Sequence, residues 1–129
     1  MTCAKICTRS PTENRLIQRD EIYLASFPFG DTAGMKLGPV LTLTGTMGPI
    51  SEVLVAYISS VVPQALLPSD ILLNPSTAEH ESTNLKAKSV LRLHKLATIH
   101  RRAIVGRLGR LPAATTSEVQ QRLRSLSGL

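Results

Sequence analysis

The chain has 129 residues, of which 43% are hydrophobic and 3% aromatic, and it carries a formal charge of +6. This length suits one domain with an aliphatic core and is too short for two well-packed domains. No apolar stretch approaches the ~20 residues that span a bilayer, so we predict no membrane partner.

The first 19 residues include four Lys or Arg residues but lack the apolar centre and small-residue cleavage site of a signal peptide. We interpret residues 1–19 as a loosely ordered extension and residues 20–129 as the folded domain. Cys3 and Cys7 have no second pair, so the sequence specifies neither a zinc knuckle nor a disulfide framework. We expect reduced thiols and a cytoplasmic protein.

Two strands and a loop are predicted near the start of the domain. The first strand covers Glu21–Phe27, and a run of small residues follows it up to Gly34. A second strand begins at Lys36, and the alternation of leucine and threonine over Val40–Thr44 is typical of a half-buried strand. The loop between them is a candidate lip over a site, and the residues after Thr44 read as a hairpin connection.

The middle of the chain predicts two more strands and excludes a long helix. The apolar run Val53–Ser59 ends at a hydroxyl pair, Ser59 and Ser60, and a short strand is expected at Ile71–Leu73. Prolines at 63, 68 and 75 interrupt this middle part of the chain and exclude a long helix there. Residues 90–99 fit either a strand or a helix by periodicity.

A C-terminal amphipathic helix is predicted from its capping signals. Thr115 and Glu118 have the spacing of a capping box, and Gly128 can end the helix. Val119, Leu123 and Leu126 share one helical face. Short strands around Pro and Gly turns plus this helix predict an α+β fold that is mainly β.

Charge is distributed unevenly along the chain. Residues 1–81 hold five Lys or Arg against eight Asp or Glu, whereas residues 82–129 hold ten against one. A basic half indicates a polyanion or an acidic peptide as partner, although a solvated surface without a ligand is an equal alternative. Because aromatic residues are few, RNA binding would rely on phosphate contacts. The candidate contacts are Lys86, Lys88, Arg92 and Lys95.

Other chemistries find little support in the sequence. His80, His94 and His100 are not at ligand spacing with carboxylates, so we predict no metal site and no cofactor. Neither Ser59 nor Ser60 lies in the Gly-flanked elbow of a triad hydrolase, and composition alone favours an ordinary polar strand end for the pair. His94, alone among leucines, fits a structural role best.

Three blocks in this order resemble the PemK/MazF family of toxin ribonucleases from toxin–antitoxin operons. They are Asp20–Phe29 with the loop and strand after it, Val53–Ser60, and Ser89–Ile99. The resemblance implies a small, partly open SH3-like β-barrel with short helices, and it favours a strand at residues 90–99. It also implies a homodimer that cleaves single-stranded RNA without a metal ion and is neutralised by an antitoxin with an acidic tail.

The resemblance also assigns the site. It implies that Ser59 is a catalytic hydroxyl and that Ser60 contacts RNA beside it. The structural loop of the site would comprise Phe29, Gly30, Asp31, Gly34 and Pro39.

Two residues depart from the family pattern. Gly38 stands where the family has its catalytic Arg, and Lys36, on the same strand face by period two, is the nearest substitute cation. Asp20 replaces a Gly. If that Gly serves a backbone with positive φ, Asp is among the few residues that tolerate it; if it leaves room for RNA, Asp20 weakens RNA approach.

Three hypotheses follow for the function. The first is an active endoribonuclease toxin. The second is a degenerate member that keeps the fold and binds antitoxin or RNA without cutting, which Gly38 favours. The third is a small basic structural RNA-binding protein that resembles the family by chance.

Overall fold

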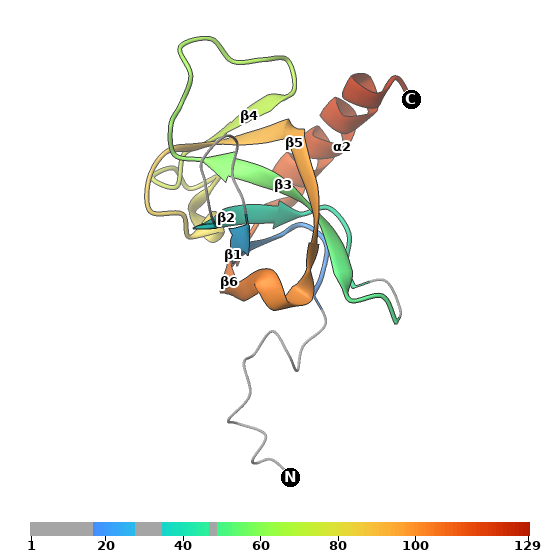
Figure 1. The fold of residues 1–129 in the computed structure, drawn as a ribbon. Coiled ribbons are helices and arrows are strands. Elements are labelled where there is room, and N and C mark those ends of the chain that lie inside the picture. Colours follow the sequence, from blue (N-terminus) through green and yellow to red (C-terminus); the bar gives the residue numbers. More distant parts are fainter. Residues whose placement is uncertain (1–16, 28–34, 47–48) are drawn as a thin grey trace.

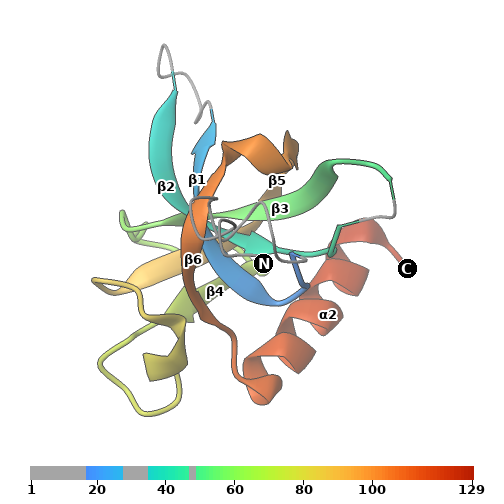
Figure 2. The same ribbon diagram turned by 90° about the horizontal axis from the view of Figure 1, so that it is seen from below.

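A computed structural model describes residues 17–27, 35–46 and 49–129, and these form one six-stranded antiparallel sheet and a C-terminal helix (Figures 1 and 2). The strand order is β4-β5-β3-β2-β1-β6, and β4 does not pair with β6, so the sheet is not closed. The predicted α+β, mainly β fold is confirmed. The elements are β1 (Glu21–Phe27), β2 (Lys36–Thr42), β3 (Glu52–Ser59), β4 (Asp70–Leu73), η2 (Glu81–Thr83), β5 (Ser89–His100), η3 (Arg101–Ala103), β6 (Ile104–Arg110) and α2 (Ala113–Ser127).

Several predicted features lie outside the described residues. They are most of the N-terminal extension with Cys3 and Cys7, and the loop residues Phe29, Gly30, Asp31 and Gly34. The described part of the extension starts at Ile17, which is only 3% exposed and packs in one of the hydrophobic cores. Its carbonyl oxygen accepts a 3.0 Å hydrogen bond from the Thr46 amide. Packing of the domain therefore includes Ile17.

The sheet is buried on both faces, because successive side chains of its central strands enter two different cores. On β2, Leu41 belongs to one core and Val40 to the other. The first core also holds Ile58, Leu91 and Val119, and α2 covers it. Figure 1 shows β5 bending sharply along its length, which lets one strand serve both cores. The ambiguous segment at residues 90–99 is thus a strand, as the resemblance implied.

Burial on both sides overturns the prediction of a half-buried strand at Val40–Thr44. β2 ends at Thr42, and Val40, Leu41 and Thr42 are all 0% exposed. The buried Thr42 hydroxyl donates to the Gln18 carbonyl at 2.6 Å and accepts from the Glu21 amide at 3.1 Å. These bonds satisfy a polar group that the leucine–threonine alternation alone assigned to solvent.

Asp20 has φ +68°, a left-handed conformation that favours glycine. Its amide donates to the Thr42 carbonyl at 2.8 Å, and its carbonyl accepts from the Leu111 amide at 3.0 Å. The backbone here therefore needs a positive φ, which is the first of the two explanations considered for the glycine in the family pattern. Asp20 accommodates the conformation and keeps both bonds.

The C-terminal helix is present, but the predicted capping box is wrong. Pro112 occupies the N-cap position, so Thr115 lies within the first turn, where it is 2% exposed. Glu118 accepts hydrogen bonds from Arg122 instead of capping the helix. Gly128 ends the helix with φ +78°, as predicted. No helix among the described residues is long and apolar enough to cross a membrane.

Strand β6 was not predicted from the sequence. Its seven residues, IVGRLGR, contain two glycines and two arginines and alternate poorly. It pairs antiparallel with β1, and Gly109 passes so close to η2 that a Cβ there would lie 2.5 Å from the Thr83 carbonyl oxygen. Gly109 thus allows a close backbone approach that no larger residue permits.

Candidate functional site

A small cavity lies between the start of β2 and the end of β3. Its volume is about 180 Å³. It brings together four residues that the sequence predicted for the site, Lys36, Gly38, Pro39 and Ser60. Leu37, Tyr57 and Ile58 complete the wall, and no described carboxylate contributes to it. We call this cavity the β2–β3 pocket.

The sheet register explains why these residues meet. Val40 pairs with Tyr57, and extending that antiparallel register by two residues places Gly38 opposite Ser59. Side chains alternate along a strand, so position 38 shares a face with Val40 and is a diagonal neighbour of Tyr57. Gly38 itself is buried and brings no side chain to this face, at the position where the resemblance expects an Arg.

The two serines that end β3 differ in their environment. Ser59 is 8% exposed, and its hydroxyl accepts a 3.1 Å hydrogen bond from the Val61 amide. Ser60 is exposed and lines the pocket. The Ser59 hydroxyl therefore stabilises the turn after β3, and Ser60 is the serine that lines the pocket.

One lysine, Lys36, lines the pocket, and a second, Lys95, lies against the ring of the lining residue Tyr57. Lys36 is exposed at the start of β2, where its backbone pairs with Phe27. Lys95 comes from β5, and its ammonium nitrogen lies 5.7 Å from the centroid of the Tyr57 ring. Neither lysine forms an ion pair with any carboxylate in the described ranges.

The other residues predicted to contact phosphate, Lys86, Lys88 and Arg92, do not line the β2–β3 pocket. Lys86 and Lys88 are exposed in the loop before β5, and Val90 near the start of that strand pairs with Ser59. Arg92, in contrast, is 18% exposed and donates from Nε to Asp70 Oδ1 at 3.1 Å. The structure thus leaves Lys86 and Lys88 open to solvent and engages Arg92 within the protein.

Asp70 is the centre of a buried charge cluster at the other side of β5. Its side chain is fully buried; its second oxygen accepts from the Leu67 amide at 2.8 Å, and His94 Nδ1 lies 3.8 Å from the first. Arg122 of α2 donates to the Asp70 carbonyl and to Glu118. Sequence reasoning missed Asp70, because its neighbours Ser69 and Ile71 carry no charge pattern.

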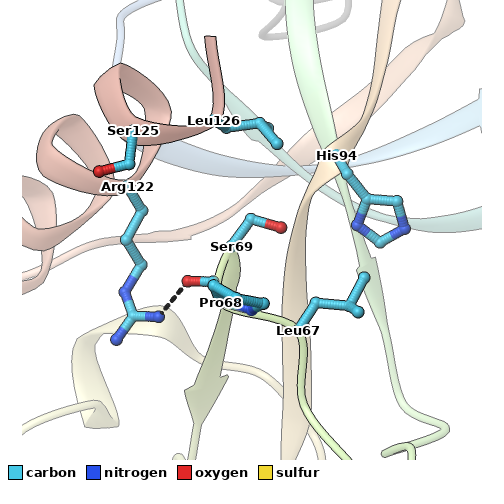
Figure 3. Close-up of a pocket in the computed structure, with 7 residues that line it drawn as sticks. All are labelled: Leu67, Pro68, Ser69, His94, Arg122, Ser125 and Leu126. Carbon is cyan, nitrogen blue, oxygen red and sulfur yellow. Dashed lines mark hydrogen bonds between the residues drawn. The ribbon is translucent and has the colours of Figure 1, made fainter. Parts of the chain in front are cut away.

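A larger, mostly apolar cavity of about 420 Å³ lies beside this cluster, between the segment before β4 and α2 (Figure 3). Arg122 crosses its edge and donates to the Pro68 carbonyl at 2.5 Å. The lining residues are Leu67, Pro68, Ser69, His94, Arg122, Ser125 and Leu126. The only sequence signal for it was Leu126 on the apolar face of the predicted helix.

The remaining histidines have local structural roles. His80 Nδ1 accepts from the Asn74 amide at 3.0 Å, and His100 Nδ1 accepts from the Arg102 amide at the same distance. Each bond stabilises a chain turn next to a 3₁₀-helix.

One ionisable group in the core has a strongly shifted pKa. Burial raises the pKa of Tyr23 to about 12, and the hydrogen bond from its hydroxyl to Glu21 at 2.6 Å acts in the same direction. Glu21 also accepts from Arg107 Nε at 2.9 Å. This Tyr23–Glu21–Arg107 chain joins β1 to β6.

Comparisons with known proteins agree on the fold. Residues 18–127 match the family described as PemK-like, MazF-like toxin of type II toxin-antitoxin system. No curated protein sequence matches the chain.

Solved structures with similar folds include MazF proteins and an endoribonuclease bound to its antitoxin. MazF from Deinococcus radiodurans has a TM-score of 0.69 at 18% identity, over 90% of this chain and 100% of that one. An endoribonuclease bound to its cognate antitoxin, from a mycobacterial species, has a TM-score of 0.64 at 16% identity, over 87% and 95%. Mycobacterium tuberculosis toxin MazF-mt6 has a TM-score of 0.65 at 20% identity, over 84% and 97%. Because the family match spans most of the domain, this chain belongs to the PemK-like, MazF-like toxins of type II toxin–antitoxin systems.

Proposed function

We propose that this chain is an endoribonuclease toxin that cleaves single-stranded RNA at the β2–β3 pocket without a metal ion and is neutralised by a cognate antitoxin. The observation that supports this most is the pocket itself, which combines Lys36 and Ser60 with the backbone of Gly38 and has no described carboxylate in its wall. A pocket of this charge attracts phosphate. Family membership removes the alternative of a chance resemblance.

Cleavage of this kind needs no water and no metal. The 2′-oxygen of the RNA attacks the adjacent phosphorus, the bond from phosphorus to the 5′-oxygen breaks, and the proton of the 2′-hydroxyl is removed while the leaving oxygen gains one. The products are a 2′,3′-cyclic phosphate and a 5′-hydroxyl. Cations and hydrogen-bond donors stabilise the charge that develops on the phosphate oxygens.

We assign the donor roles by exposure. Ser60 is the hydroxyl that faces the pocket, whereas the Ser59 hydroxyl is engaged with Val61. Lys36 supplies a positive charge, although an ammonium lacks the fork with which Arg grips two phosphate oxygens. Loss of one preorganised donor typically lowers the rate by ~10² to 10³. We therefore expect slow cleavage.

The second candidate is a degenerate member that binds antitoxin or RNA without cutting it, and Gly38 is the observation that favours it. The two candidates make different predictions for one substitution. Gly38→Arg returns a permanently charged, forked donor to a position opposite Ser59, so it should raise cleavage by ~10² if the rest of the site is intact.

The test measures cleavage of a labelled single-stranded RNA in EDTA by the unmodified chain, Gly38→Arg and the matched control Gly38→Ala. Circular dichroism and light scattering check that each variant folds. Ser60→Ala in the Gly38→Arg background should abolish the gain, and Ser59→Ala tests the assignment that the family resemblance implies. A folded Gly38→Arg protein that cuts no faster would support the binding-only candidate, and cleavage that requires a divalent ion would contradict the metal-free mechanism.

The proposed partners follow from charge and from exposed apolar surface. Ten of the chain's 15 Lys and Arg residues lie beyond residue 81, which suits RNA and the acidic tail of an antitoxin in the cytoplasm. The solved MazE–MazF complexes of Deinococcus radiodurans support an antitoxin partner. We also propose a homodimer, because Met35, Leu37 and Val61 are each more than half exposed. A monomer in light scattering at micromolar concentration would contradict it.

A further inference from the structure

We infer that Lys95 supplies the phosphate-binding cation that Gly38 lacks, acting from a neighbouring strand across the Tyr57 ring. This inference rests on the proposed function of the β2–β3 pocket and assigns one more residue to it. It depends on an irregularity in β5, on the position of Tyr57 and on the absence of a competing carboxylate.

The irregularity lies between two paired positions of β3 and β5. Ala56 pairs with Leu96, but the next residue, Tyr57, pairs with Arg92. Three consecutive residues of β5 therefore have no partner on β3. Bulges of this kind bend a strand and redirect its side chains, and they are common beside functional sites.

The three bulged residues point in three different directions. Leu93 is 0% exposed in the core under α2, and His94 lies beside the Asp70 carboxylate. Lys95 instead extends over Tyr57. Within the bulge, Leu93 thus packs in the core, His94 lies at the buried cluster, and the exposed Lys95 places its ammonium over Tyr57, a residue of the pocket wall.

Tyr57 is a neighbour of both this ammonium and position 38. It lines the pocket, and by the sheet register it is a diagonal neighbour of Gly38 on the same face. Gly38 is buried and supplies no charge at this position. Lys95, held 5.7 Å from the ring centroid, brings a positive charge to the same side of the sheet.

The charge of Lys95 is available to a ligand. No described carboxylate pairs with it, unlike Arg92, whose charge is matched by Asp70 at 3.1 Å. An aromatic ring holds an ammonium in place without neutralising it, so the full positive charge remains for a phosphate oxygen. Lys36 of β2 then lines the pocket, and Lys95 of β5 lies against its Tyr57 wall.

The test compares variants in binding and in cleavage. Binding uses a mixed-sequence single-stranded RNA with 2′-O-methyl groups, which cannot form the cyclic phosphate. Lys95→Ala should weaken binding by roughly tenfold and lower the slope of log affinity against log salt by about 0.7, as expected for one lost phosphate contact. Lys95→Arg should retain both values.

Arg124→Ala is the matched control, because it removes one exposed positive charge near the far end of α2, on the opposite side of the molecule from the ends of β2 and β3 that form the pocket (Figures 1 and 2). It should change binding less than twofold. Equal losses for Lys95→Ala and Arg124→Ala would overturn the inference and leave the proposed nuclease untouched. A chain that binds the RNA through Lys95 but never cuts would contradict the nuclease and support the inference, while no RNA binding at all would overturn both.

A double-mutant cycle gives a second, independent test. If Lys95 and an Arg at position 38 serve the same phosphate, the loss caused by Lys95→Ala should shrink from roughly tenfold to threefold or less in the Gly38→Arg background. Undiminished loss in that background would show that Lys95 acts elsewhere and would overturn the inference.

Discussion

Positively charged side chains have opposite environments in two regions of this molecule. Around Asp70 and Glu21, arginines are paired at short range: Arg92 with Asp70 at 3.1 Å and Arg107 with Glu21 at 2.9 Å. At the β2–β3 pocket, Lys36 in the wall and Lys95 against the Tyr57 ring have no described carboxylate partner. The first region, which we call the paired framework, holds strands and helix together, and in the second the charge of each lysine is not matched by a described carboxylate.

This difference separates stability from binding. A buried or half-buried charge that loses its partner is left desolvated, so substitutions in the paired framework should cost stability. An exposed lysine loses little when it is removed, because water already solvates it. Net charge alone could not make this distinction, since both kinds of residue contribute equally to the +6 total.

The largest expected effect in the paired framework is that of Asp70→Asn. Asp70 is 2% exposed and neutralises Arg92, so the variant leaves a mostly buried guanidinium without its counter-charge. We expect a loss of about 3 kcal/mol in the free energy of unfolding, measured by urea denaturation. Glu79→Gln, at a side chain that is 65% exposed, is the control and should change the same quantity by less than about 0.5 kcal/mol. Equal effects would break the comparison.

The next largest effect concerns backbone packing in β6 and compares substitutions at two of its glycines, Gly109 and Gly106. A Cβ at Gly109 would lie 2.5 Å from the Thr83 carbonyl oxygen, whereas a Cβ at Gly106 meets nothing within 4 Å. Gly109→Ala must push β6 away from η2, and we expect it to destabilise the protein by about 2 kcal/mol. Gly106→Ala should be close to neutral. Thermal denaturation measures the stability of both variants, and equal stabilities would contradict this prediction.

The sequence predicted most of the sheet, because aliphatic runs such as Val53–Ser59 are strong signals for buried strands. It missed β6, because this segment forms a strand through its pairing with β1 and its own composition gives no strand signal. It also misjudged Thr42, because a buried hydroxyl with two partners cannot be told from an exposed one by alternation.

The sequence grouped Lys36, Gly38 and Ser60 in one candidate site, and the three residues do line one cavity, because regular strand pairing brings β2 and β3 together. The sequence could not distinguish Arg92 from Lys95. Their different environments depend on a three-residue bulge and on Asp70, which lies 22 positions away from Arg92 in the sequence.

A smaller effect concerns Tyr23, whose pKa is raised to about 12 from an ordinary value of 10. The folded state favours the neutral phenol, so this contribution to stability is complete below pH 10 and is lost as pH rises from 10 to 12. Tyr23→Phe should cost about 1 kcal/mol at pH 8 through the lost hydrogen bond to Glu21. It should also lose less stability than the unmodified chain between pH 10 and 12. Parallel pH profiles for the two proteins would contradict the assignment.

The smallest expected effect lies in the pocket and completes the comparison. Lys36 is exposed and has no described carboxylate partner, so Lys36→Ala should change the free energy of unfolding by less than about 0.5 kcal/mol. The same variant should weaken binding to the 2′-O-methyl RNA, because it removes the lysine that lines the pocket. Urea denaturation and an RNA titration on the same preparation measure both quantities. If Lys36→Ala destabilises the protein as much as Asp70→Asn does, the pocket lysines are structural and the division between paired framework and binding site fails.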